Sequence, residues 1–232
     1  IQQLTSVGIQ ATPGATAECL RLDRPTRVDE LPGFHAGWLT VQDESAQEAA
    51  AWLDPQPGER LLDLCAAPGG KTTHLAERMQ NQGQITAVDV QAERLERLRA
   101  NCRRLGITCV DVVEHRESES LPAGPFDAAL VDVPCSNTGV LGKRPDARWR
   151  ICLADLEELP ALQQRLLSTA LLQVRPGGRA LYSTCSIEPE ENANVVANVL
   201  REHPDWTLVR ERTSIPDLPA DGGYLALLRR SL

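Results

Sequence analysis

The stretch LLDLCAAPGGKT, Leu61–Thr72, predicts the fold of this chain. It begins in an apolar run, Arg60–Leu64, that is typical of a buried strand, and it ends where an amphipathic helix begins at Lys71. Between strand and helix, Gly69 and Gly70 let the backbone turn sharply and approach a bound molecule closely. Such units of strand, glycine-rich turn and helix bind nucleotide-like ligands at the carboxyl ends of parallel strands.

An acidic residue after the next apolar run indicates the kind of ligand. Asp89 follows the expected strand Gln84–Val88 and lies about 20 residues after the turn, where a carboxylate can accept hydrogen bonds from ribose hydroxyls. The turn matches neither the GxxxxGK[ST] phosphate-binding loop nor the GxGxxG dinucleotide pattern. A ribose without a pyrophosphate favours S-adenosylmethionine. The alternative is an ordinary tight turn with Asp89 as a helix N-cap.

Strands and helices alternate along the chain, which predicts an α/β fold with a doubly wound, mostly parallel sheet and helices on both faces. The last two strands are expected to supply an antiparallel edge. Residues 1–35 are expected to form a linking or accessory segment, and residues 36–232 the main domain. We expect strands at 60–64, 84–88, 109–113, 126–131, 179–183, 206–210 and 224–228, and helices at 1–7, 46–53, 71–79, 92–105, 153–174 and 189–202, with a break at 176–178.

Composition limits the classes of protein to which the chain can belong. No run approaches the ~18 apolar residues of a membrane span, and no signal peptide is visible, so we expect a soluble, cytoplasmic protein, a monomer that binds no membrane. The net charge of -8 argues against holding nucleic acid by bulk attraction. Seven cysteines without CxxC or Cys/His ligand spacing indicate neither a disulfide framework nor a metal site.

Two of the cysteines follow predicted strands. Asp132–Gly139 (DVPCSNTG) places Cys135 after one strand, and Ser183–Ser186 (STCS) places Cys185 after another. If both strands are parallel, both thiols emerge at the edge that carries the glycine-rich turn. A thiolate there is a strong nucleophile. The other cysteines that sit in apolar patterns are interpreted as packing residues: Cys65, Cys102, Cys109 and Cys152.

Three stretches, DLCAAPGGKT (63–72), DVPCSNTG (132–139) and STCSIEPEEN (183–192), closely resemble the RNA cytosine-5 methyltransferases of the Nol/Nop/Sun family, especially the bacterial RsmB (Sun/Fmu) branch. The resemblance covers roughly Pro32 to the C-terminus and implies the Rossmann-like fold of class I methyltransferases that use S-adenosylmethionine. It also implies roles for individual residues. The methionine part of the cofactor is held by Cys65, Ala66, Ala67, Pro68, Gly69, Gly70 and Lys71, and its ribose by Asp89. The resemblance further implies that Asp132 lies beside the cofactor and the target base, that Cys185 is the nucleophile, and that Cys135 aids release of the methylated product.

Covalent catalysis explains why such a site needs these groups. Carbon 5 of cytosine is a poor nucleophile, so a thiolate first adds to carbon 6 and makes carbon 5 an enamine carbon that can attack a methyl group. A carboxyl group at Asp132 can hydrogen-bond N3 and stabilise the adduct. The base that removes the carbon 5 proton stays open between Cys135 and a water. Lys71 either steadies Asp132 or this base, or points outward from the first turn of its helix.

One position departs from the family pattern. Members usually carry an Asp after the third strand that contacts the adenine side of the cofactor, whereas this chain has Val112-Val113-Glu114-His115-Arg116. Glu114 is the nearest acidic substitute and is our expected cofactor contact. The alternative for Glu114 is a solvated loop charge, and His115 is expected on the surface.

A basic loop follows the first thiol. LGKRPDARWR, residues 141–150, surrounds Trp149 with Lys143, Arg144, Arg148 and Arg150. Arginine and lysine neutralise phosphates while an indole stacks on an unpaired base, so we expect this loop to bind RNA. The alternative is a solvated loop. A base that reaches a cysteine must leave its stack, so the target is expected to be unpaired or flipped.

The resulting functional prediction is methylation of cytosine carbon 5 in RNA, of the 16S ribosomal type. Methylation of tRNA cytosine shares every motif, and a non-catalytic RNA-binding or ribosome-assembly factor that keeps the fold is the alternative from another class. DNA methyltransferases place the nucleophile in the Pro-Cys motif, whereas here a second Thr-Cys motif exists. The RsmB branch has a separate N-terminal RNA-binding domain, of which residues 1–35 are the expected trailing linker.

Overall fold

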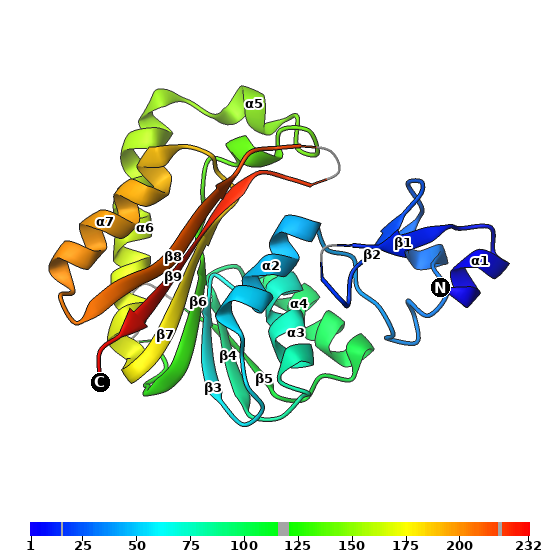
Figure 1. Cartoon of the computed structure of the whole chain (residues 1–232), viewed down its shortest axis with the longest axis horizontal. Helices are drawn as coiled ribbons and strands as arrows, with labels where there is room; N and C mark the ends of the chain where they lie inside the picture. Colours follow the sequence, from blue (N-terminus) through cyan, green and yellow to red (C-terminus); the bar gives the residue numbers. More distant parts are fainter. Residues whose placement is uncertain (15, 116–120, 218–219) are drawn as a thin grey trace.

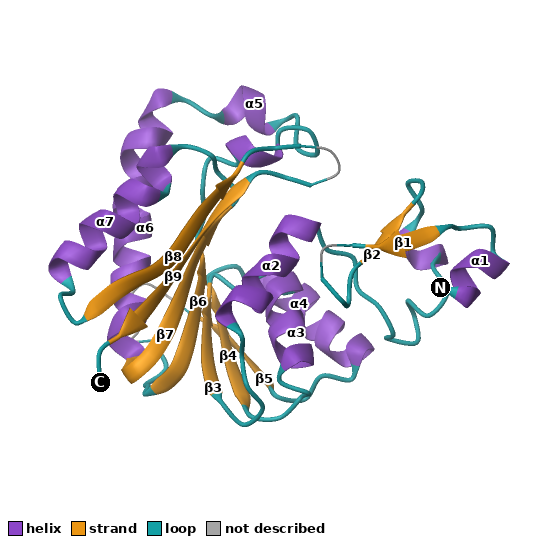
Figure 2. Ribbon diagram, viewed as in Figure 1, coloured by secondary structure: helices purple, strands orange, loops and turns teal. Residues whose placement is uncertain are grey.

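The computed structural model describes residues 1–14, 16–115, 121–217 and 220–232 and is built around one seven-stranded sheet (Figures 1 and 2). Its strand order is β5-β4-β3-β6-β7-β9-β8. The first five strands in this order are parallel, β9 runs antiparallel to β7, and β8 antiparallel to β9, which confirms the predicted antiparallel edge. The strands are β3 (Arg60–Leu64), β4 (Gln84–Asp89), β5 (Val110–Glu114), β6 (Phe126–Asp132), β7 (Val174–Thr184), β8 (Trp206–Ser214) and β9 (Gly223–Arg230).

Helices cover both faces of the sheet, because neighbouring apolar residues of each buried strand point to opposite sides. Leu61 packs with helices α2 and α3, whereas Leu62 packs with α6 and α7. In Figure 1 these two groups of helices lie on opposite sides of the strands, and α4 lies beside α2 and α3. The helices are α2 (Glu44–Leu53), α3 (Gly70–Arg78), α4 (Ala92–Leu105), α5 (Ala147–Arg150), α6 (Leu153–Gln173) and α7 (Ala193–Glu202), with short 3-10 turns η1 (Val28–Glu30), η2 (Thr138–Val140) and η3 (Pro189–Glu191).

Strand β7 differs from the expectation at its start. Pro176-Gly177-Gly178 was expected to separate helix from strand, yet it lies inside the strand, which begins directly after α6. The pairing register with β6 shifts here, from Val174 opposite Phe126 to Arg179 opposite Ala128, so the Pro-Gly-Gly residues form a bulge. The expected helix 189–202 is likewise interrupted, since η3 ends before α7 begins. Cys152 is exposed at the start of α6 and is therefore no packing residue.

The N-terminal residues form a small unit of their own beside α2 and α3 (Figure 2). Helix α1 (Gln2–Ser6) precedes an antiparallel hairpin of β1 (Ala11–Pro13) and β2 (Leu20–Leu22). The sequence predicts an extended segment around 19–22 but no strand at 11–13. Leu4, Ile9 and Leu31 bury one another in a cluster separate from the main core. A separate segment at residues 1–35 remains a prediction. Among the described residues, no helix is both long and apolar enough to cross a membrane.

Candidate active site

A cavity of about 570 Å³ opens at the carboxyl edge of the parallel strands. It reaches from the ends of β4 and β5 to the loops that follow β6 and β7. This is the edge at which open α/β sheets bind ligands. The residues that line it include eight of those predicted from sequence, namely Cys65, Ala67, Pro68, Asp89, Asp132, Cys135, Arg144 and Cys185, together with Leu64, Val88, Val90, Gln91, Arg94, Arg97, His115, Val133, Pro134, Asn137 and Leu166.

The glycine-rich turn forms one wall of this cavity. Gly69 has a φ of 102°, and a Cβ there would lie 2.3 Å from Leu98 Cδ1, so no other residue fits between the turn and α4. Cys65, Ala67 and Pro68 line the cavity. The remaining predicted turn residues, Ala66, Gly69 and Gly70, support the turn without lining it.

Asp89 is fixed by the backbone of the turn. Its Oδ2 accepts a hydrogen bond from Ala67 N at 3.0 Å, and its Oδ1 accepts one from Gln91 N at 2.9 Å. The second bond resembles the capping role weighed as an alternative, although Gln91 itself is the N-cap of α4. Asp89 also lines the cavity, and each carboxylate oxygen has further acceptor capacity. The side chain can therefore brace the turn and accept from a ligand hydroxyl at once.

Lys71 points to Asp132. Its Nζ lies 2.7 Å from Asp132 Oδ2, so of the two alternatives for Lys71 the structure has the one in which it steadies Asp132. Burial lowers the pKa of Lys71, but attraction and hydrogen bonding to Asp132 outweigh it, and the pKa is raised. The lysine is therefore positively charged at neutral pH beside the end of β6.

The two predicted thiols meet. Cys135 Sγ and Cys185 Sγ are 3.2 Å apart, and Cys185 Sγ lies 3.1 Å from Asn137 Oδ1. Asn137 adopts a left-handed conformation, and its Nδ2 donates to Cys135 O at 2.7 Å. The side-chain amide thus contacts both cysteines.

The environment makes the thiols unequal. The hydrogen bond with Cys135 lowers the pKa of Cys185, burial opposes this, and the charges of Lys71 and Arg144 also lower it. The same hydrogen bond, with burial, raises the pKa of Cys135 well above its usual range. Of the two thiols, Cys185 therefore loses its proton more readily, and Cys135 is the better S–H donor between them.

The structure places two neighbouring residues at the end of β5 differently. Glu114 is exposed and is not among the residues that line the cavity, whereas His115 lines it. His115 N donates to Asp89 O at 2.9 Å, which holds the ends of β4 and β5 together at this point. The register pairs Asp89 with Glu114, so neither charge nor strand register indicated that His115 would line the cavity.

Sequence reasoning missed Asp63, which lies buried in β3 behind the turn. Its Oδ2 accepts from Thr72 Oγ1 at 2.6 Å, and its Oδ1 has no hydrogen-bond partner among the described residues. Burial raises the pKa of Asp63 to about 7, although the hydrogen bond of Thr72 opposes the shift. A charged residue inside the apolar run LLDLC was the available signal.

The predicted RNA residues lie beyond the thiols. Arg144 lines the cavity, and Trp149 on α5 is 86% exposed. Arg148 and Arg150 are also exposed on α5, and Arg150 pairs with Asp146.

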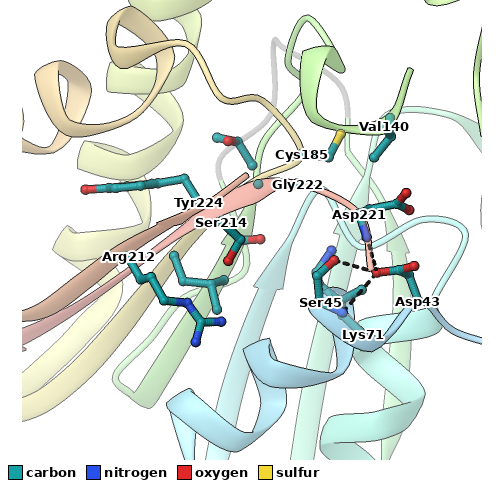
Figure 3. Close-up of a pocket in the computed structure, with 15 residues that line it drawn as sticks. Asp43, Ser45, Lys71, Val140, Cys185, Arg212, Ser214, Asp221, Gly222 and Tyr224 are labelled. Atoms are coloured by element: carbon teal, nitrogen blue, oxygen red, sulfur yellow. Dashed lines mark hydrogen bonds between the residues drawn. The ribbon is translucent and has the colours of Figure 1, made fainter. Parts of the chain in front are cut away.

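Lys143 instead ion-pairs with Asp43 and Asp221, and its charge is therefore already balanced. These carboxylates border a smaller cavity of about 90 Å³ on the other side of Cys185 (Figure 3). Asp43 Oδ1 accepts from Ser45 N and Asp221 N there, as the dashed lines in Figure 3 show. Lys143 thus ties the loop after Cys135 to the start of α2 and to the β8–β9 connection.

Residues 50–221 match the family model described as 16S rRNA methyltransferase RsmB/F. The chain belongs to this family. Among RsmB/F-related proteins, the ribosomal RNA small subunit methyltransferase B of Pectobacterium carotovorum is 46% identical over 228 residues, which are 95% of this chain and 53% of that protein.

Two solved structures from Pyrococcus horikoshii share the fold of this RsmB/F chain. A methyltransferase homolog protein superposes with a TM-score of 0.85 at 31% identity and covers 99% of this chain and 81% of its own. NSun6 superposes with a TM-score of 0.82 at 27% identity, over 92% of this chain and 59% of its own. The Rossmann-like methyltransferase fold is thereby confirmed. The chain spans about half the length of the curated relatives that it matches.

Proposed function

We propose that this chain is the catalytic region of an enzyme that methylates carbon 5 of cytosine in 16S-type ribosomal RNA with S-adenosylmethionine. The observation that carries the proposal is the pair of thiols, 3.2 Å apart, at the end of a cavity that also contains Asp132. A non-catalytic RNA-binding factor would not need one thiol of lowered pKa beside another of raised pKa.

The large cavity fits a nucleoside cofactor in its donor set. Asp89 offers carboxylate oxygens to the ribose hydroxyls, and the backbone of the turn from Cys65 to Pro68 faces the amino acid part. We assign the adenine side to His115 rather than to Glu114, because only His115 lines the cavity. When bound, S-adenosylmethionine supplies a methyl group on a positively charged sulfur.

Cys185 is the residue that attacks the base. Its thiolate adds to carbon 6 of cytosine while the carboxyl group of Asp132 gives a proton to N3, which leaves a neutral enamine and an Asp132 carboxylate that Lys71 holds in place. N3 returns this proton to Asp132 when the product is released. After methyl transfer, a base removes the carbon 5 proton, the double bond reforms, and the Cys185–carbon 6 bond breaks with its electron pair returning to sulfur. The S–H of Cys135 hydrogen-bonds that leaving thiolate, which is how Cys135 aids release.

The RNA approaches from the loop after Cys135. Arg144 lies at the cavity, and Arg148, Trp149 and Arg150 lie exposed on α5 for phosphate and base contacts. Lys143 joins them only if it leaves its two carboxylates. The name of the family favours 16S ribosomal RNA over tRNA, and such a substrate places the enzyme in the cytoplasm.

The test is methyl transfer to 16S ribosomal RNA, with tRNA as the comparison, by wild type, Cys185→Ala and Cys135→Ala. We expect 5-methylcytosine in ribosomal RNA from wild type, none from Cys185→Ala, and an RNA–protein adduct that survives denaturation from Cys135→Ala. Equal product from all three proteins would contradict the covalent mechanism. RNA binding without product in wild type would favour the non-catalytic factor, and product in tRNA alone would favour the tRNA enzyme.

A further inference from the structure

The turn that precedes α7 contacts the loops of both thiols. Glu191 ends η3, Asn192 follows it, and both side chains are buried although both are polar. A buried carboxylate is costly unless several donors satisfy it, so its partners indicate what it is there to hold.

Glu191 binds the Cys135 loop. Its Oε1 accepts from Ser136 N at 2.9 Å, and its Oε2 accepts from Ser136 Oγ. Gln163 Nε2 donates to the same Oε1 at 2.9 Å and to Pro134 O at 2.9 Å. The residues on both sides of Cys135 are therefore tied, directly or through Gln163, to one carboxylate.

Asn192 binds the Cys185 loop. Its Oδ1 accepts from Thr184 Oγ1 at 2.6 Å, and its Nδ2 donates to Ser186 O at 2.9 Å. These two partners lie on either side of Cys185. Each of these neighbouring residues thus holds one of the two thiol loops, which Ser136 Oγ and Ser186 Oγ also join directly at 3.1 Å. The turn is itself anchored to β7 because Tyr182 OH donates to Glu191 O at 2.6 Å.

We propose that Glu191 and Asn192 are positioning residues that set the separation of the two thiols, Glu191 for the release thiol Cys135 and Asn192 for the nucleophile Cys185. The assignment of the two chemical roles rests on the function proposed above. Neither residue lines the cavity, so each acts through the loop that it holds. Loss of Glu191 contacts moves Cys135 away from the leaving thiolate, and loss of Asn192 contacts moves the attacking thiolate itself.

The first test uses the chain alone. Diamide, an azo oxidant, accepts two electrons and two protons from Cys135 and Cys185 and leaves one disulfide between them, at a rate that depends on the distance between the sulfurs. We expect Glu191→Ala and Asn192→Ala each to slow this cross-link by about tenfold or more, since a displacement of ~1 Å at a reacting pair can cost about a hundredfold. Glu191→Gln should keep a rate near wild type, because its amide oxygen and nitrogen can still serve the two N–H donors and Ser136 Oγ.

Val199→Ala is the matched control for stability. Val199 is buried in α7 on the same side of the sheet, and its truncation loosens the core without touching either thiol loop. Cross-linking in Val199→Ala should equal wild type. Rates for Glu191→Ala and Asn192→Ala within twofold of this control would overturn the proposal. If Glu191→Ala does not fold, Ser136→Ala removes one of its bonds and should slow the cross-link in the same direction.

The second test uses 16S ribosomal RNA and measures the covalent adduct and the methylated product. Glu191→Ala should accumulate adduct as Cys135→Ala does, whereas Asn192→Ala should form less adduct and less product. An identical ratio of adduct to product in the two variants would contradict the separate assignments. Absence of product from wild type would instead remove the proposed function, and the cross-linking rates would still decide whether these residues position the thiols.

Discussion

Replacing Asp63 with asparagine should stabilise the protein, and increasingly so as the pH rises. Asp63 is buried behind the glycine-rich turn, with Thr72 as the hydrogen-bond donor to one of its oxygens. Burial raises its pKa from 3.8 to about 7. Because the folded pKa lies above the unfolded one, the folded protein holds a proton that the unfolded chain loses, so stability falls as the pH rises from about 4 to about 7 and is flat above that range.

The size of this effect follows from the shift. A difference of about three pKa units, at ~1.4 kcal/mol for each unit, makes the ionised Asp63 cost about 4 kcal/mol of unfolding free energy above neutral pH. The amide that Asp63→Asn introduces does not ionise, and its oxygen can still accept a hydrogen bond from Thr72 Oγ1. Between about pH 5 and about pH 8, the advantage of the variant should therefore grow by about 3 kcal/mol.

Urea unfolding of wild type and Asp63→Asn at the two pH values measures this growth. Subtracting the wild-type unfolding free energy from that of the variant at each pH removes the contribution of the groups that titrate alike in both proteins. Asp127→Asn is the control. Burial raises the pKa of Asp127, but hydrogen bonds from Arg60 N and Arg175 outweigh it and lower the pKa, so its contribution is lost only in acid and its difference from wild type should not change between these pH values. A difference for Asp63→Asn that is the same at both pH values would refute the reasoning.

Three further predictions concern the site. The rate of Cys185 alkylation by iodoacetamide, plotted against pH, should have its midpoint below the usual thiol pKa. Lys71→Met should move that midpoint to higher pH, because a positive charge that favours the thiolate is lost. A midpoint that stays in place, measured by mass-spectrometric labelling, would contradict this. In calorimetry, His115→Ala should weaken binding of S-adenosylhomocysteine by about tenfold, a loss of ~1.4 kcal/mol, whereas Glu114→Ala should bind it as wild type does. The opposite result would restore Glu114 as the cofactor contact. Trp149→Ala should weaken RNA binding by ~1–3 kcal/mol in a filter assay without changing S-adenosylhomocysteine affinity, and unchanged RNA affinity would place the RNA elsewhere.

Local pattern was sufficient for the elements that frame the cavity. Strand β3 and helix α4 have the predicted bounds. The signal for β3 is an apolar run followed by a turn, and the signal for α4 is a helical repeat that ends at Gly106, so each is contained in neighbouring residues. The bulge in β7 was missed since Pro-Gly-Gly is typical of loops, and only the pairing of Val174 and of Arg179 with β6, on either side of these residues, keeps the strand continuous. Strand β1 was missed because three residues carry no periodic pattern.

The residues of the candidate site also differ in whether neighbouring sequence was enough to predict their positions. The positions of Cys135 and Cys185 at one edge follow from parallel strands, and their contact confirms that expectation. The buried carboxylate of Glu191 could not be recognised, because its partners lie 28 and 55 residues away in sequence. Lys143 appeared to be a free cation for the same reason, since Asp43 is 100 residues from it.

The reversed direction of β9 determines which part of the site the β8–β9 connection reaches. Because β9 runs against β7, the connection that enters it arrives at the edge where Cys185 lies, and Gly222 N donates to Gly139 O there. None of the described residues of this connection lines the cavity that we assign to the cofactor. A change in the described part of this connection would therefore reach the Cys135 loop, through Gly139 and Lys143, before it reached the glycine-rich turn.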